Sequence, residues 1–265
     1  MSVQQEHMAD TRPLSIRFTR KGALIPETYA AARHWDRQLS VDANIARIRR
    51  DNLIGAKSAA WLQDVTVTLA ARFRQGHGLA PLVVLAQSGL AIEQWRECLL
   101  WHLGGQDALW FAFLSEWLNV AYRDGRFRIR TEDVMPFVVA RTAGRVADGK
   151  GLSDYSQIRV ARDLLLMATG FGLLSGKAVR EFTSYRLSDE GFLYVLHALA
   201  EHEANPDRII NAPEWRMFLT QPADVEQTLL RLHQFQQVEY HVAGSIIHLR
   251  LPYSSLLAYA ESLVS

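Results

Sequence analysis

Residues 173–196 read LLSGKAVREFTSYRLSDEGFLYVL. The middle of this segment alternates apolar and polar residues, which is typical of a β-strand, although the sequence on both sides has helical periodicity. A helical pattern ends at Gly170 and Gly172, about a dozen residues of alternating pattern follow, and a new helical pattern begins after YRLSDEG. The segment therefore predicts a helix, a short β-ribbon and a second helix in succession.

This order matches the recognition helix, wing and closing helix of a winged-helix domain. Many bacterial winged-helix regulators have a comparable GLI…YxLTxxG run, which GLLSGKAVREFTSYRLSDEG resembles in order and spacing. A purely structural hairpin between two helices has the same pattern, so both interpretations remain open. Strand alternation places Lys177 and Arg180 on opposite faces of the ribbon, so both reach DNA only if the ribbon enters edge-on.

The rest of the sequence predicts a mainly α fold of several helix-turn-helix or winged-helix-like modules with short β-hairpins. An N-terminal helix-turn-helix-like module covers residues 1–78, where Pro26 lies in a first helical turn and Ser40 and Ser58 cap two further helices. Residues 79–150 form an apolar helical middle, in which tryptophans at helical spacing indicate a core. In this middle region, Thr131 is expected to cap a helix.

Two further modules complete the expected organisation. A short Gly-containing linker at 149–154 leads into the winged-helix-like module, residues 151–205. Residues 206–265 form a helix-hairpin-helix module whose turn is expected at Ala243-Gly244.

Charge is segregated along the chain although the net charge is only +1. Residues 1–60 carry a net +4 and residues 120–186 a net +5, whereas residues 61–119 carry −2 and residues 187–265 carry −6. Arginine supplies 25 of the 29 basic residues, and its planar guanidinium suits phosphate oxygens better than the ammonium of lysine does. A GC-rich genome explains the arginine to lysine ratio equally well, but it does not explain the clustering.

The two basic blocks predict a surface that holds DNA phosphates with little readout of bases. The candidate DNA-binding residues are Arg47, Arg49, Arg50, Lys57, Arg126, Arg128, Arg130, Arg159, Arg162, Lys177, Arg180 and Arg186. Arg47 and Arg50 share a helix side from which Arg49 is turned away, so the first two are expected to contribute more. A solvated helix face is the alternative interpretation of this run. The acidic last quarter is expected to bind protein rather than nucleic acid.

Motifs of the common enzyme classes are absent from the sequence. It contains no GxxxxGK[ST], GxGxxG after a strand, HExxH or CxxC, so neither catalytic residues nor a cofactor is predicted. No pair of histidines has metal-ligand spacing, and His241 and His248 are not expected to lie opposite one another in the C-terminal hairpin. Cys98 has apolar neighbours, which indicates an inert buried thiol. A lone cysteine and a polar N-terminus without a signal-peptide core favour the cytoplasm, and no apolar stretch is long enough to cross a membrane.

Several landmarks together resemble the BrxA family, the small helical component of BREX bacteriophage-defence systems. They are FTRKGALIPETYAAARHW, ANIARIRRDNLIGAKSAAWLQDVTVTLAARFRQ, the Trp-rich middle and LHQFQQVEYHVAGSIIHLRLP. The resemblance implies a non-enzymatic protein of helix-turn-helix or winged-helix-like modules that binds double-stranded DNA and works with other BREX proteins. It also allows an RNA-binding role, because the family has been likened to an antitermination fold.

The sequence therefore predicts a non-catalytic accessory of a BREX system that binds double-stranded DNA. An assembly adaptor that binds other defence proteins and an RNA-binding antitermination-like protein remain the alternatives.

Overall fold

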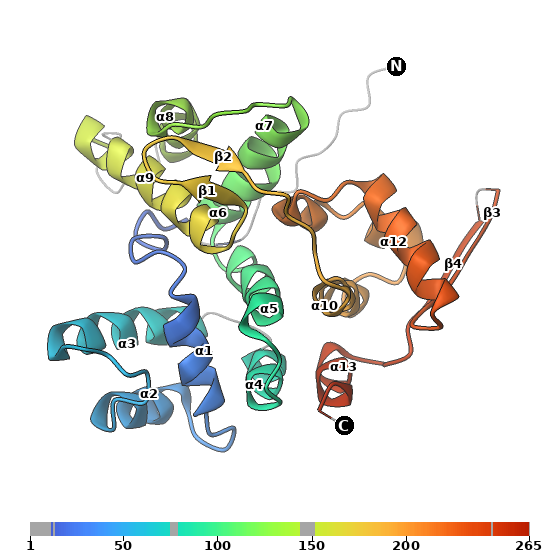
Figure 1. Ribbon diagram of the computed structural model, residues 1–265, viewed down its shortest axis with the longest axis horizontal. Helices are drawn as coiled ribbons and strands as arrows, with labels where there is room; N and C mark the ends of the chain where they lie inside the picture. Colours follow the sequence, from blue (N-terminus) through green and yellow to red (C-terminus); the bar gives the residue numbers. More distant parts are fainter. Residues whose placement is uncertain (1–11, 13, 75–78, 144–151, 245, 265) are drawn as a thin grey trace.

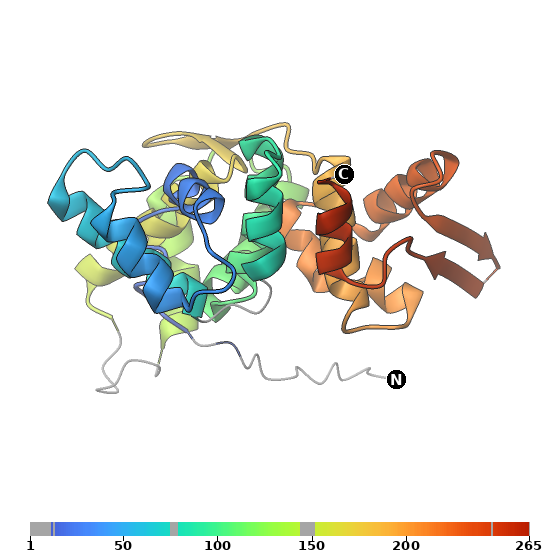
Figure 2. The same cartoon turned by 90° about the horizontal axis from the view of Figure 1, so that it is seen from below.

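The computed structural model describes residues 12, 14–74, 79–143, 152–244 and 246–264. Helices dominate this part of the chain, and its strands form two antiparallel hairpins, so the expected mainly α class is confirmed. The molecule is elongated, with α9 and the N-terminal helices towards one end and the C-terminal hairpin at the other (Figures 1 and 2). Most of the polar N-terminal lead and half of the predicted linker at 149–154 lie outside the described residues.

Three helices make up the N-terminal module: α1 (Ile25–Arg33), α2 (Val41–Arg50) and α3 (Ala59–Arg74). Pro26 occupies the first turn of α1, and the Ser40 hydroxyl accepts the Ala43 N–H at the start of α2, as predicted. Ser58 accepts the Trp61 N–H at the start of α3 in the same manner. These local caps satisfy backbone donors that have no partner within the helix.

The buried guanidinium of Arg72 holds the turn that leads into α1. It donates hydrogen bonds to the carbonyl oxygens of Ala23 (3.0 Å), Gly22 (2.6 Å) and Phe18 (3.3 Å). Leu24, just before α1, has a left-handed backbone with φ of 52°, which is costly for a residue with a branched side chain. Burial lowers the pKa of Arg72 to about 10, so this group still carries its charge at neutral pH. α3 therefore fixes the entry of the chain into α1.

The middle of the chain supplies much of the core. Its helical segments are α4 (Leu79–Gln87), α5 (Ile92–Gly104), α6 (Ala108–Ala112), the π-helix η1 (Phe113–Leu118) and α7 (Asn119–Arg123). Trp95 and Trp110 are fully buried, and Trp117 stacks on Phe113 with ring centroids 5.5 Å apart. These tryptophans belong to the core, as their spacing predicted.

A helical pair and a hairpin follow: α8 (Thr131–Thr142), α9 (Asp154–Gly170), β1 (Leu174–Gly176) and β2 (Arg180–Phe182). β1 pairs with β2, and the backbone of Ile129, ahead of α8, forms a one-residue antiparallel bridge with Arg180. Ser153 caps α9 by accepting the Ser156 N–H. Thr131 does not cap α8, because that helix already includes it. The preceding Arg130 is the first capping position, and its backbone N–H donates to Asp133.

The C-terminal part consists of α10 (Asp189–Ala200), α11 (Pro206–Ile210), the 3-10 helix η2 (Pro213–Phe218), α12 (Pro222–Gln234), β3 (Glu239–Ala243), β4 (Ile246–Arg250) and α13 (Leu256–Ser262). The predicted hairpin is present, but Ala243 pairs with Ile246, so the turn comes one residue later than expected. His241 consequently lies directly opposite His248, and the prediction that they are not opposite was wrong. α13 packs back against α4 and α10.

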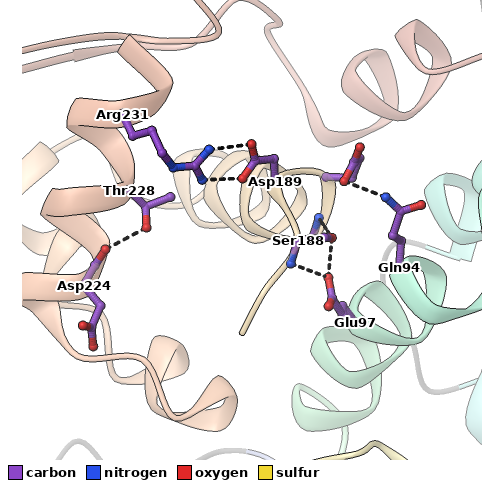
Figure 3. A network of polar contacts seen from close by, with 9 residues as sticks. Gln94, Glu97, Ser188, Asp189, Asp224, Thr228 and Arg231 are labelled. Carbon is purple, nitrogen blue, oxygen red and sulfur yellow. Dashed lines mark hydrogen bonds and ion pairs between the residues drawn. The ribbon is translucent and has the colours of Figure 1, made fainter. Parts of the chain in front are cut away.

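Polar contacts at the start of α10 join α5, α10 and α12 (Figure 3). Glu97 of α5 is buried, and its Oε2 accepts hydrogen bonds from the backbone N–H of Ser188 (3.1 Å) and from the Ser188 hydroxyl (2.5 Å). A Cβ at Gly191 would lie 2.1 Å from the same oxygen, so only glycine permits this approach. On the other side, Asp189 accepts two hydrogen bonds from Arg231 of α12. α10 is thereby held between its two neighbours.

We expect the pH dependence of stability to change in Glu97→Gln. Burial raises the pKa of Glu97, although the hydrogen bonds from Ser188 and the charge of Arg96 oppose this. An acid with a raised folded-state pKa contributes stability that is lost as pH rises from its ordinary value, here 4.5, through the raised value. The free energy of unfolding of the wild type should therefore fall, relative to that of Glu97→Gln, as pH increases above 4.5.

Urea denaturation at a series of pH values measures this difference. Glu93→Gln, on the exposed side of the same helix, should follow the wild type. A gap between wild type and Glu97→Gln that stays constant with pH would contradict the assignment.

Candidate nucleic-acid interface

The outer face of α9 carries Tyr155, Arg159, Arg162 and Leu166, which recur every three or four residues and so lie on one side of the helix. Tyr155 is 74% exposed and Leu166 49% exposed, whereas Leu164, on the opposite side, is fully buried. The Arg159 guanidinium lies 5.9 Å from the centre of the Tyr155 ring. No ion pair or hydrogen bond engages the Arg162 side chain among the described residues. α9 thus presents two arginines and an aromatic ring to solvent.

Arg20, which is not among the predicted DNA-binding residues, adds a third cation to this face. Its loop runs beside α9, since a Cβ at Gly22 would lie 3.8 Å from Leu166. Partial burial raises the pKa of Asp163, while the positive charges of Arg159, Arg20 and Arg162 act in the opposite direction. One carboxylate therefore lies among three guanidinium groups. The sequence shows that Arg20 is basic, but only the packing of the loop on α9 places it here.

The turn between β1 and β2 exposes Lys177. Gly176 has φ of 97°, and a Cβ at this position would lie 2.3 Å from the carbonyl oxygen of Val179, so the tight turn requires glycine. No ion pair engages Lys177 in the described part of the chain. Its ammonium is available at the tip of the hairpin, where the ribbon interpretation placed a DNA contact.

Arg180 differs from the expectation of a surface contact. It is only 6% exposed, and its Nε donates to Thr169 Oγ1 at 3.2 Å. Its backbone N–H and carbonyl both bond to Ile129 at 2.8 Å, in the bridge ahead of α8. Burial lowers the pKa of Arg180, and the nearby charge of Arg162 adds to this effect. Arg180 is therefore mainly a structural link between the hairpin, α9 and the strand-like residue Ile129.

The turn between α7 and α8 presents three exposed arginines, two of which already have acidic partners. Arg126 pairs with Asp133 at 3.0 Å, and Arg128 approaches Glu181 of β2 at 3.9 Å. Arg130 is exposed, and its backbone rather than its side chain caps α8. Surface pairs of this kind are weak, so phosphates can compete for these cations.

The first basic block is largely engaged within its own module. Arg47 bonds to the carbonyl oxygen of His34, Arg49 Nε donates to Thr66 Oγ1 at 3.0 Å, and Arg50 forms a bidentate pair with Asp51. Lys57 is exposed, and none of the described acidic residues forms an ion pair with it. The side chain of Lys57 is therefore more available to a phosphate than the side chains of the three arginines.

Arg186 lies apart from the α9 face, in the segment between β2 and α10. Its side chain is exposed and reaches the rim of a cavity of about 380 Å³ between this segment and α12.

Together these elements define a mainly helical protein in which a helix pair, a hairpin and a basic outer helix face form one unit. The model of the BrxA family matches residues 12–203, which run from the loop ahead of α1 to the end of α10, and the chain belongs to this family. This confirms the resemblance seen in the sequence, and membership suggests a BREX-associated role. No curated protein and no solved structure matches the chain.

Other sites expected from sequence can also be placed. Cys98 is buried, and burial raises the pKa of its thiol, as expected for an unreactive cysteine. Within the described ranges, no group of three His, Cys, Asp or Glu side chains could hold a metal ion. Among the helices that the structure describes, none has the length and apolar character needed to cross a membrane.

The two basic residues of the hairpin should respond differently to substitution. Arg180→Met removes the guanidinium and leaves Thr169 Oγ1 without its donor, so we expect a loss of about 1–2 kcal/mol in the free energy of unfolding. Lys177→Ala should change it by less than about 0.5 kcal/mol, because this side chain is in solvent. Urea denaturation of both variants measures the contrast. Equal stabilities would show that the Arg180 side chain does not hold the hairpin on α9.

Proposed function

We propose that the protein is a non-catalytic accessory of a BREX system that binds double-stranded DNA through α9 and the β1–β2 hairpin. The observation that carries the proposal is the open face of α9, where exposed Tyr155 and Arg162 and the half-buried Arg159 lie beside Arg20. The order of Ile129 bridge, α8, α9, β1 and β2 supports a winged-helix interpretation, with α9 as the recognition helix and Lys177 at the tip of the wing.

We expect the basic residues to contribute unequally to DNA binding. Guanidinium groups without an acidic partner bind phosphate without first breaking an ion pair. Arg162 shares the charge of Asp163 with Arg159 and Arg20 and forms no close ion pair among the described residues, whereas Arg50 is held by Asp51 and Arg126 by Asp133. The α9 face is therefore the principal contact, and the arginines of α2 contribute less than the sequence alone indicated. The absence of nucleotide-binding and hydrolase motifs from the sequence supports a non-catalytic role.

Binding should be salt-dependent and indifferent to base sequence. Each phosphate contact contributes about 0.9 to the slope of log affinity against log salt concentration. Arg159→Gln combined with Arg162→Gln should reduce this slope by about two and weaken binding to every duplex by a similar factor. Fluorescence anisotropy with unrelated blunt duplexes over a range of salt concentrations measures both effects.

Arg216→Gln, an exposed arginine of η2 outside both basic blocks, is the matched control and should bind like the wild type. No binding to any duplex at about 50 mM salt, where phosphate contacts are strong, would refute the proposal. Preferential binding of single-stranded RNA would favour the antitermination-like alternative.

One observation favours the second candidate function, an adaptor for other defence proteins. α12 with its C-cap and the C-terminal hairpin expose large apolar side chains, namely Leu230 (50%), Phe235 (67%), Val242 (52%) and Ile246 (71%). They lie in the acidic last quarter, which offers few phosphate contacts to the body of a duplex. An adaptor role is compatible with DNA binding by α9, because the two surfaces lie at different ends of the molecule (Figures 1 and 2).

A further inference from the structure

The cavity beside Arg186 is walled by three separate parts of the chain. Tyr122 comes from α7, residues 185–187 and Phe192 come from α10 and the segment ahead of it, and the remaining wall comes from η2, α12 and the loop between them. Its volume of about 380 Å³ lies at the lower end of the range of small-ligand pockets. It has room for one nucleotide but not for a strand.

The floor of the cavity is aromatic and its rim is polar. Phe192 and Phe218, which are almost fully buried, form the base together with Leu187. Tyr122 is 41% exposed, and its ring packs against Phe182 of β2 in a T-shaped arrangement with centroids 5.2 Å apart. Burial raises the pKa of Tyr185, so its hydroxyl stays protonated and can donate a hydrogen bond. Flat aromatic side chains of this kind can stack on any nucleobase.

The rim supplies both hydrogen-bond donors and acceptors. The hydroxyls of Thr220 and Thr228 each donate to a backbone carbonyl, at 3.2 Å and 2.8 Å, which leaves their lone pairs as acceptors. Asp224 accepts the Gln221 N–H through one carboxylate oxygen, and Gln227 is exposed beside it. A nucleobase edge offers the complementary mixture of amino, ring nitrogen and carbonyl groups.

The positive charge of Arg186 favours a ligand that carries a negative charge. Arg231, which also lines the cavity, is neutralised by its two hydrogen bonds to Asp189 (Figure 3). By contrast, Arg186 forms no ion pair or hydrogen bond with any side chain of the described residues. An unpaired guanidinium at the mouth of an aromatic cavity suits a phosphate attached to a planar ring.

We propose that this cavity binds a single unstacked nucleotide, with the base between Tyr122 and the aromatic floor and the phosphate on Arg186. The inference deepens the proposed function. One source of the ligand is an unpaired terminal nucleotide of bound DNA, and for this source the inference rests on the proposed function. β2 ends at Phe182, four residues before Arg186, so the chain runs directly from the hairpin to the cavity. A free nucleotide offers the same chemistry.

The test compares a blunt duplex, the same duplex with one unpaired adenosine at each 3′ end, and the same duplex with an abasic residue there. The unpaired adenosine should tighten binding about tenfold, by the usual size of base stacking on an aromatic side chain, and the abasic end should not. Free dAMP, followed by isothermal titration calorimetry, forms the second arm. An effect of the dangling base assigns the nucleic-acid source, and dAMP binding without such an effect assigns a free nucleotide.

Tyr122→Ala and Thr228→Leu, which remove the wall and fill the rim, should abolish the adenosine effect and dAMP binding while leaving blunt-duplex affinity unchanged. Phe235→Ala, an exposed aromatic residue outside the cavity, is the matched control and should retain both. Melting curves establish that the variants fold. Absence of both effects in the wild type, or their persistence in folded Tyr122→Ala and Thr228→Leu, would overturn the inference. Loss of blunt-duplex binding alone would instead refute the proposed function, because the dAMP arm does not depend on it.

Discussion

The arrangement of the helices from α10 onwards depends on the hydrogen bonds that the buried carboxylate of Glu97 accepts from Ser188. Burying a carboxylate is costly unless it is hydrogen-bonded, and here Ser188 supplies both of its donors at the start of α10. The first backbone N–H groups of a helix also carry partial positive charge, which favours an acid at this end. The missing side chain of Gly191 allows the carboxylate to approach. The direction of α10 is therefore fixed by one residue of α5.

Two functional regions follow from that direction. The segment ahead of Ser188 continues from the β1–β2 hairpin, so the hairpin is anchored at one end by α10 and at the other by α9. The residue after Ser188, Asp189, holds Arg231 and with it α12, which forms one wall of the cavity beside Arg186. The positions of the β1–β2 hairpin, the cavity and the C-terminal helices thus all depend on the contact between Glu97 and Ser188.

Signals confined to a few residues could be read from the sequence, and contacts between distant residues could not. Ser40, Ser58 and Ser153 act within one helical turn, so the helix starts that they cap were predictable. Glu97 and Ser188 are 91 positions apart, and nothing in the local pattern connects them. The His241–His248 pairing depended on a turn position that shifted by a single residue, and a strand register changes completely with such a shift.

The candidate site shows the same division between local and distant information. Clustering of arginines was visible in the sequence, whereas the partner of each arginine was not. Arg180 belongs to a basic block by position but is buried against Thr169, and Arg20 joins the α9 face from a loop far away in the sequence. A count of basic residues therefore overstates some contacts and omits others, because a guanidinium can stabilise the fold as readily as it can bind phosphate.

The acidic last quarter repels DNA phosphates. This repulsion opposes the attraction of the α9 face wherever a duplex lies close to both surfaces. At physiological ionic strength the field of an exposed charge decays over about 8 Å, so separated surfaces act almost independently. α9 and the C-terminal hairpin lie towards opposite ends of the long axis (Figures 1 and 2). Repulsion from the acidic end is thus felt mainly at low salt, where it directs a duplex towards α9. The net charge of +1 consequently says little about affinity, which depends on the few unpaired cations within one Debye length of the bound phosphates.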